Sequence, residues 1–330
     1  MKITFTLSIF ILLICGCKSN SKINDLTKMG LKGHVKNFNQ VSYGIKIANG
    51  DTIKIRNRYS FPFEKGNLTN SIKIYNEFDK SGFECNFNLE GYIEVWKGLD
   101  LENEPYRIFK YEYQKDHLLK KISELYGNGQ LYKKEVVIYN SDKKIKEKQE
   151  YNSEGELRTR DVYTYKNNNR FLETKNVSVK NLKETDKWEY SFDGNGNVTT
   201  QKYWQYGKLY AFEEFKYNVN NQIVEYVLRT PKSIGAIELY EYNSNNQLVK
   251  KYDGKLDGSK ELGRTYQYDS IGNVNECISI NPMGKEKRTS ISYTYDENSN
   301  WIKSIIVSDD DLFDNKKSTF IVERSIEYFK

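Results

Sequence analysis

A short phrase that recurs along the chain constrains its fold more than any other feature. The phrase is an aromatic residue, Asn or Asp, two or three turn-forming residues, Gly or Asn, and then an apolar residue. Its copies begin at Phe78, Tyr151, Phe192, Tyr217, Tyr242, Tyr268 and Tyr295. From Phe192 onward the copies follow one another at spacings of 25, 25, 26 and 27 residues. Self-similarity at such a period is typical of stacked structural repeats.

Each copy predicts a strand, a turn and a second strand. Tyr266 and Tyr268 are two residues apart, so their side chains project from the same face of a strand. The carboxylate of Asp269 accepts backbone hydrogen bonds in a turn, and Gly272 tolerates the positive φ of a tight reversal. Weaker turn sequences, such as Tyr126–Leu131, lie between the copies and divide each period into two strands of about six residues. We therefore expect a meander of hairpins.

The rest of the chain favours the same architecture. Isoleucines alternate with other residues between positions 45 and 55, on either side of Asn49-Gly50, which is a strong hairpin signal. The run from Ser308 to Lys317 is expected to form a long hairpin loop, and the apolar pattern leaves little room for helix. The sequence predicts an all-β fold, an antiparallel β-meander repeat array. We expect its sheet to be open or partly wound, in a single domain covering residues 33–330.

The first residues of the chain predict export and lipidation. Lys2 precedes an apolar run, Ile3–Ile14, that is shorter than the roughly 20 residues needed to span a bilayer. The segment Ile14–Cys17 resembles a bacterial lipobox, in which the cysteine is lipidated and becomes the new N-terminus. We expect residues 1–16 to be a lipoprotein signal peptide and residues 17–32 to be a tether after lipidated Cys17. An ordinary signal peptide, cleaved without lipidation, is the alternative.

The repeat phrase resembles a known family. Residues Tyr268–Asn273 read Tyr-Asp-x-x-Gly-Asn, which resembles the YD repeats of the RHS family. The ending, from Tyr295 through Trp301 to Ile326-Glu327-Tyr328, resembles repeat lipoproteins of Bacteroidota. In RHS proteins such repeats wind into a β shell around a toxin domain. This chain is far shorter and has no long non-repeat tail after the array, so the resemblance implies a fold and not a toxin function.

Residues suited to catalysis or metal binding are scarce in the sequence. His34 and His117 are the two histidines, which leaves little material for an imidazole metal site or a histidine-based triad. Residues 193–197 resemble a calcium loop but lack its Gly at the sixth position and its Glu at the twelfth, so we expect a plain turn. The acidic run 309–311 is expected to be a solvated loop. We therefore predict no catalytic residue, no metal site and no cofactor, although a carboxylate pair for glycoside hydrolysis would show only in the fold.

Aromatic residues are the main resource for binding, since the chain contains 27 Tyr. Exposed Tyr and Trp can stack on sugars or anchor protein interfaces. The candidate tryptophans are Trp96, Trp188, Trp204 and Trp301, and the alternative for each is a place in the repeat core.

Two short signals and the cysteines complete the candidates. Residues Asp51-Thr52-Ile53 and Asp269-Ser270-Ile271 are similar to a short O-glycosylation signal of Bacteroidota. Cys85 and Cys277 remain once Cys17 is lipidated. Across an open sheet these two would be some 70 Å apart, far beyond the roughly 7 Å that a disulfide needs between Cα atoms. We expect two free, mostly buried thiols.

Together these features predict an exported, membrane-anchored repeat lipoprotein, located at the outer membrane on its periplasmic or cell-surface face. The net charge of +6 is spread as alternating Lys and Glu, which argues against a nucleic-acid partner. Besides the membrane, which it contacts through its N-terminal lipid, we expect an unknown protein or glycan as partner, in a non-catalytic binding or scaffold role. The ligand-binding residues stay unknown at this level. A polysaccharide-acting hydrolase and an immunity or inhibitor lipoprotein are the alternatives.

The anchor makes a direct prediction. Cys17→Ala removes the sulfur that carries the lipid, so we expect the variant to incorporate no labelled fatty acid and to leave the membrane fraction. Cys15→Ala is the control and should behave as the natural protein does. Retention of the Cys17→Ala protein in the membrane fraction would show that the lipoprotein interpretation is wrong.

Overall fold

The computed structural model describes residues 24–48, 51–56, 82–166, 170–178, 183–281, 283–309 and 317–330. These ranges contain a four-residue helix and 21 strands of one sheet. The elements, in chain order, are α1 (Asp25–Lys28), β1 (Val35–Ala48), β2 (Asp51–Arg56), β3 (Gly82–Phe87), β4 (Ile93–Leu99), β5 (Pro105–Tyr113), β6 (Leu119–Tyr126), β7 (Leu131–Tyr139), β8 (Ile145–Asn152), β9 (Leu157–Lys166), β10 (Arg170–Ser178), β11 (Lys183–Phe192), β12 (Val198–Gln205), β13 (Lys208–Tyr217), β14 (Ile223–Arg229), β15 (Ile234–Tyr242), β16 (Leu248–Gly254), β17 (Lys260–Tyr268), β18 (Val274–Ile280), β19 (Glu286–Tyr295), β20 (Trp301–Asp309) and β21 (Lys317–Tyr328).

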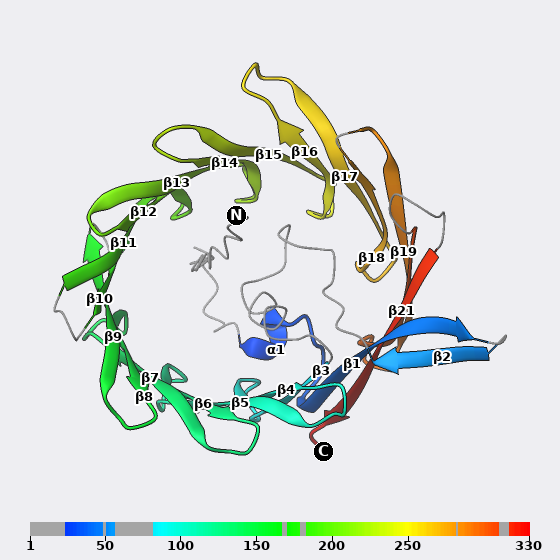
Figure 1. The fold of residues 1–330 in the computed structure, drawn as a ribbon, viewed down its shortest axis with the longest axis horizontal. Helices are drawn as coiled ribbons and strands as arrows, with labels where there is room; N and C mark the ends of the chain where they lie inside the picture. The colour runs from blue at the N-terminus through cyan, green and yellow to red at the C-terminus, as the bar shows by residue number, and fades with distance from the viewer. Residues whose placement is uncertain are drawn as a thin grey trace.

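The strands from β3 to β21 pair in chain order and form a 19-strand antiparallel meander. The first and last of these described strands do not pair with each other, because β1 lies between them. Asn39 of β1 is opposite Ser325 of β21 on one side and opposite Glu84 of β3 on the other. The hydrogen-bonded order therefore returns to its start through β1, and the sheet winds round in a ring (Figure 1).

The hairpin turns define two rims of this ring. The described turns that follow β3, β5, β7 and the later odd-numbered strands form one rim, which we call the α1 rim. Those that follow β4, β6, β8 and the later even-numbered strands form the far rim. At both rims a recurrent side chain accepts hydrogen bonds from the amides two and four residues on. It is provided by Asn88, Asp100, Asn140, Asp193, Asn218, Asn243, Asp269, Asn281 and Asp296.

Tyrosine hydroxyls link seven of the described odd-numbered strands to the strand before them. A tyrosine at the end of an odd-numbered strand donates to the carbonyl oxygen at the start of the preceding strand, over 2.7–2.8 Å. The donor and acceptor pairs are Tyr113 and Ile93, Tyr139 and Leu119, Tyr165 and Ile145, Tyr217 and Val198, Tyr242 and Ile223, Tyr268 and Leu248, and Tyr293 and Val274. Burial raises the pKa of Tyr268 to about 12, so its hydroxyl keeps the proton that it donates.

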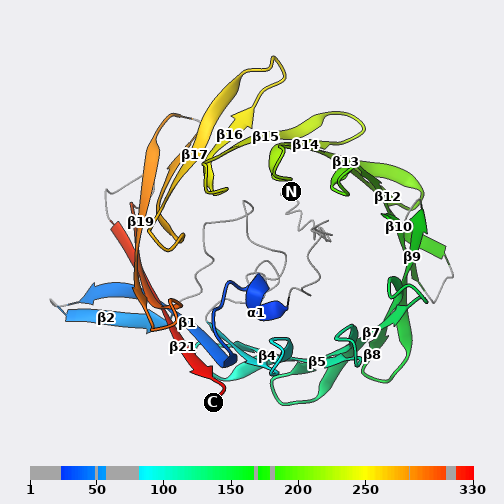
Figure 2. The ribbon, with the colours of Figure 1, turned by 180° about the vertical axis from the view of Figure 1, so that it is seen from behind.

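Helix α1 packs against the sheet within the segment predicted to be a tether. Asn24 caps it by accepting a hydrogen bond from the Thr27 amide at 2.9 Å, and its side-chain amide donates to the Glu90 carbonyl at 2.7 Å. Leu26 joins an apolar cluster with Phe38 and Trp96. Both ribbon views place α1 inside the ring (Figures 1 and 2), and the contact of Asn24 with Glu90 puts the helix at the α1 rim. Within the described ranges, no helix has the length and apolar character needed to cross a membrane.

The all-β antiparallel meander with little helix is confirmed. Its 19 strands do not close on themselves, and β1 joins the two ends of the partly wound sheet. The hairpin around Asn49-Gly50 is confirmed by its register, with Ala48 opposite Asp51, although the two turn residues lie outside the described ranges. The strands are longer than predicted: β17, β18 and β19 have 9, 7 and 10 residues. They are longer because the tight turns take up few residues.

The repeat also extends further than the sequence phrase suggested. Aromatic residues that end strands at the α1 rim already recur every 26 residues at Phe87, Tyr113, Tyr139 and Tyr165. Tyr151 ends β8, so its turn lies at the far rim and out of step with the other copies. The copy at Phe78 lies almost wholly outside the described residues. Because both rims use the same turn chemistry, one phrase cannot tell them apart.

The prediction of two free thiols is confirmed, since Cys85 and Cys277 are both free and buried. Their separation has a different origin from the one expected. Through β1, the wound sheet joins β18 to β3 by five neighbour steps, which is about 24 Å along the sheet. That is much less than an open array would give, yet it is still too far for a disulfide.

The tyrosine hydroxyls predict a stability change. Tyr268→Phe removes one hydroxyl and leaves the buried Leu248 carbonyl without its donor, so the free energy of unfolding should fall by about 1 kcal/mol. Tyr206→Phe is the control, because Tyr206 is 74% exposed in a far-rim turn. Urea denaturation measures both variants. Equal values for the two would contradict a structural role of the hydroxyl.

Candidate functional site

The inward face of the sheet can be traced from α1. The helix lies inside the ring (Figure 2), and Leu26 packs in the cluster that contains Cys85 and Trp96, so these side chains point inward. Residues directly opposite each other in antiparallel strands share a face of the sheet. The inward row then continues from β3 to β7 through Cys85, Trp96, Phe109, Glu124 and Lys133. The inner wall therefore changes from apolar beneath α1 to charged beyond β5.

An exposed group of tyrosines surrounds an arginine on this inner wall, at the far rim. Tyr106, Tyr126 and Tyr132 are 37%, 43% and 39% exposed, and we call them, with Arg107, the tyrosine cluster. The Arg107 guanidinium carbon lies 4.2 Å from the ring centre of Tyr132 and 4.9 Å from that of Tyr126. The two rings meet edge to face, with their centres 5.2 Å apart. Cation–π contacts of this kind hold the guanidinium in place and leave ring surface open to solvent.

Charged residues behind the cluster are paired with one another. Glu124, which is 8% exposed, lies 3.4 Å from Arg107 Nη1 and 3.8 Å from Lys133 Nζ. Lys133 also donates to Glu150 Oε2 at 2.7 Å. Burial raises the pKa of Glu124, against the opposing effect of the Lys133 and Arg107 charges. Burial alone would lower the pKa of Lys133, but its hydrogen bond to Glu150 and the negative charges of the nearby glutamates together outweigh that effect, so the pKa is raised.

Two glycines position the Tyr106 side of the cluster. A Cβ atom on Gly98 would lie 2.8 Å from Tyr106 Cζ and 2.9 Å from Trp96 Cη2, so both rings lie over this bare backbone. A Cβ atom on Gly127 would lie 1.7 Å from the Pro105 carbonyl oxygen. That close approach lets the Gly127 amide donate to the Tyr106 carbonyl at 3.1 Å. The turn after β6 is thereby fastened to the start of β5.

Further round the inner wall, carboxylates interact with tyrosines and lysine. Glu213 Oε1 accepts the hydroxyl of Tyr226 at 2.8 Å, and Glu213 is 2% exposed. Glu238 accepts the hydroxyl of Tyr240 and the ammonium of Lys251, the latter at 2.8 Å. Among the described residues, no group of three or more His, Cys, Asp and Glu could hold a metal ion.

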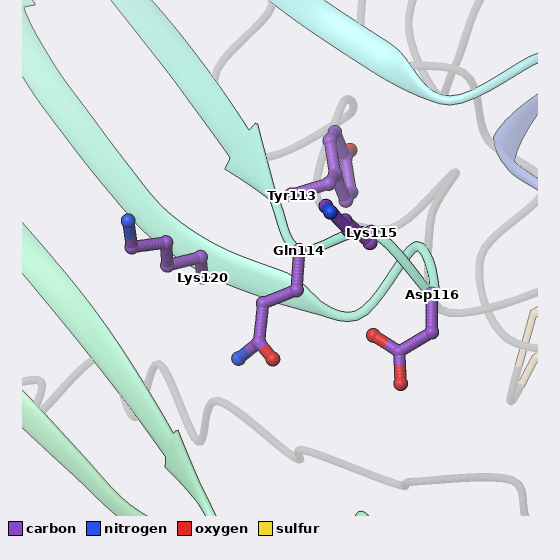
Figure 3. Close-up of a pocket in the computed structure, with 5 residues that line it drawn as sticks. All are labelled: Tyr113, Gln114, Lys115, Asp116 and Lys120. Carbon is purple, nitrogen blue, oxygen red and sulfur yellow. The ribbon is translucent and has the colours of Figure 1, made fainter.

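A hollow of about 770 Å³ opens at the α1 rim, beside the turn between β5 and β6 (Figure 3). Tyr113, Gln114, Lys115, Asp116 and Lys120 line it, and in the close-up their side chains fan out rather than converge on one point. The Tyr113 hydroxyl donates to the Ile93 carbonyl, and Asp116 pairs with Lys143 at 2.9 Å. These contacts hold the turn and its neighbouring strands together. The side chains that line the hollow do not converge on a common position for a ligand (Figure 3).

The histidines and acidic runs of the sequence occupy turns and ends. His34 is exposed one residue before β1. His117 lies in a turn with φ 60°, and its ring stacks on that of Tyr92 with the ring centres 5.1 Å apart. Asp193 accepts two turn amides and the side chain of Asn197, as a plain turn requires. Asp309 ends β20, opposite Lys317, while residues 310 and 311 lie outside the described ranges.

The four tryptophans do not share one environment. Trp96 is 2% exposed in the apolar cluster under α1, in line with a core role. Trp188 is half-buried and stacks on Tyr203 with ring centres 4.5 Å apart. The guanidinium carbon of Arg324 lies 3.1 Å from the ring centre of Trp301. Trp204 lies opposite Lys187, whose ammonium is 5.8 Å from its ring.

The remaining sequence candidates are only partly described. Ser270 is exposed in an α1-rim turn, where its neighbour Asp269 holds the turn backbone. Of Thr52 only the backbone, in β2, is described. Cys17 lies outside the described residues, and so does the rest of the chain up to position 23, including the predicted signal peptide.

Sequence reasoning missed the tyrosine cluster. Its members come from three strands, and Tyr126 was noted only as the start of a weaker turn. The cluster depends on the close approach of two backbones at Gly127, and no pattern of residues in the sequence predicts that approach.

The sequence matches no model of a known protein family and no curated protein. Solved structures are similar to the chain at low identity. A porin-like protein from Bacteroides uniformis has a TM-score of 0.36 and 10% identity, over 89% of this chain and 96% of that one. The Photorhabdus luminescens Tc holotoxin pore has a TM-score of 0.29 and 12% identity, over 81% of this chain and 18% of that one. The expected resemblance to RHS repeats is thus accompanied by a Tc toxin structure at a TM-score below 0.5 and by no sequence family.

Gly127 makes a prediction for the site. Gly127→Ala would drive a methyl group into the Pro105 carbonyl and push β5 away from the turn, so the free energy of unfolding should fall by about 2 kcal/mol or more. Gly129→Ala is the control in the same turn. It meets nothing within 4 Å and is strained only by its φ of 84°, which costs about 1 kcal/mol. Equal losses in urea denaturation would contradict the close approach.

Proposed function

We propose that this protein is a non-catalytic binding protein of the cell envelope, anchored by a lipid on Cys17, which holds a protein or glycan ligand on the inner wall of its ring. The observation that carries the proposal is the tyrosine cluster. Tyr126 and Tyr132 keep about two fifths of their surface exposed, although they belong to a sheet whose other inward aromatic residues are largely buried. Tyr and Arg are enriched among the residues that dominate binding energy.

The position of the cluster fits the proposed anchor. The first described residue, Asn24, contacts the turn at Glu90 and therefore lies at the α1 rim. Cys17 is seven residues before it, a stretch of at most about 25 Å. A lipid on Cys17 would keep the α1 rim near the membrane. The tyrosine cluster, at the far rim, would face away from the membrane, where a ligand can approach it.

A hydrolase requires two carboxylates that flank a substrate. Glu213 and Glu238 lie on β13 and β15, with Tyr226 on the strand between them, and both accept tyrosine hydroxyls. The near-complete burial of Glu213 leaves it no access to a substrate. These contacts favour binding over hydrolysis.

Affinity capture tests the proposal. Tagged full-length protein should retain material from envelope extract and growth medium, identified by mass spectrometry and carbohydrate analysis. The double variant Tyr126→Ala/Tyr132→Ala should lose most of that material, because both stacking surfaces are removed. Tyr206→Ala, which removes a more exposed tyrosine at the same rim, should retain it. Identical capture by all three proteins would contradict a binding role for the cluster.

A further inference from the structure

We propose that the ligand of the tyrosine cluster is a neutral glycan, an inference that rests on the proposed binding function. The ring surfaces of Tyr106, Tyr126 and Tyr132 that face solvent are flat, apolar and edged by hydroxyls. A pyranose ring presents a matching surface, since its C–H groups gather on one face while its hydroxyls project round the edge. Stacking on the tyrosines and hydrogen bonding beside them can therefore occur together.

The charges beside the cluster decide against an anionic ligand. Arg107 lies against Glu124 and Lys133 against Glu150, so two cations are balanced by two carboxylates on the inner wall. An acidic polymer would bring unpaired negative charge next to Glu124, which burial has already made costly to ionise. A ligand without charge leaves these pairs intact and can use their outer lone pairs and N–H groups as hydrogen-bond partners.

The inner wall next to the cluster also decides against an apolar peptide. The inward positions of β7 and β8 that follow the cluster carry Glu135, Lys148 and Glu150, with Val137 opposite Lys148. Lys148 and Glu135 pair with each other at 3.5 Å. Because Val137 is almost fully buried, this part of the wall offers little apolar surface to aliphatic side chains, whereas a hydroxyl-rich chain can hydrogen bond to its charged groups. The concave face moreover suits a slender polymer better than a globular partner.

Calorimetric titration of the purified full-length protein tests the assignment. The neutral probes are the hexasaccharides of the maltose, cellulose, xylan and mannan series. The comparison probes are a hyaluronan hexasaccharide, a polygalacturonate hexamer and a proline-rich decapeptide. We expect at least one neutral probe to bind. Its dissociation constant should stay within about twofold between roughly 0.05 and 0.5 M NaCl, because no ion pair forms across the interface.

The variants identify the stacking surface. Tyr126→Ala and Tyr132→Ala should each weaken binding by about tenfold, whereas Tyr126→Phe keeps the ring and should bind within about threefold. Tyr206→Ala should leave binding unchanged. Loss of binding in Tyr206→Ala to the same degree would overturn the assignment to the cluster.

The outcomes separate the ligand class from the binding function. Binding only of the acidic probes, with steep salt dependence, overturns neutrality, and binding only of the peptide overturns the glycan. If no neutral probe binds while the capture experiment still depends on Tyr126 and Tyr132, the ligand class is wrong and the binding function stands. If neither experiment depends on these two residues, both proposals fail.

Discussion

Strand β1 is the element on which the rest of the structure depends, because it hydrogen bonds along both of its edges. A 19-strand meander would otherwise end in two edges of unpaired N–H and C=O groups, which are prone to pair with other chains. Residues 37–44 of β1 pair with β21, and residues 37–41 pair with β3. One strand therefore provides hydrogen-bond partners for both edges and joins the two ends of the 19-strand meander. The concave inner wall, with α1 and the tyrosine cluster on it, exists only because of this pairing.

Between these ends the structure is held by interactions that repeat at short range. Each tyrosine hydroxyl that reaches the start of the preceding strand spans only 19 or 20 residues of chain. The turn carboxylates and amides act over four residues. Local contacts of this kind cost little loop entropy, so each hairpin can form with its neighbour, and the long-range pairing of β1 with β21 comes at the greatest entropic cost.

This division explains what the sequence could and could not predict. The alternation around Tyr266 and Tyr268 and the turn residues Asp269 and Gly272 act locally, and the strands and turns they predict are present. The pairing of Asn39 with Ser325 and Glu84 depends on register between distant segments, and no local pattern reports it. The prediction that Cys85 and Cys277 form no disulfide was correct, although it was based on a separation calculated for an open sheet. Their true separation along the sheet is shorter because β1 joins its two edges.

The candidate site could not be predicted from the sequence, for the same reason. The cluster takes its residues from three strands, and nothing in the sequence distinguishes Arg107, Tyr126 and Tyr132 there. The register of the strands brings them together on one face. Their inward direction follows only from the row that begins at Cys85 and Trp96 beneath α1. Paired carboxylates and lysines, such as Glu124 and Lys133, look like a solvated surface in sequence and prove to line the inner wall.

The most direct test of the account is the distance between β3 and β21 in solution. Spin labels on Glu84→Cys and Ser325→Cys, which both lie opposite Asn39, would report it by electron paramagnetic resonance. With β1 between the two strands, the labelled Cα atoms should be about 10 Å apart, two steps across the sheet. An array that does not return through β1 would place them 18 steps apart, about 86 Å in a flat sheet. A dominant distance beyond about 50 Å would contradict the wound sheet and the inner wall built on it.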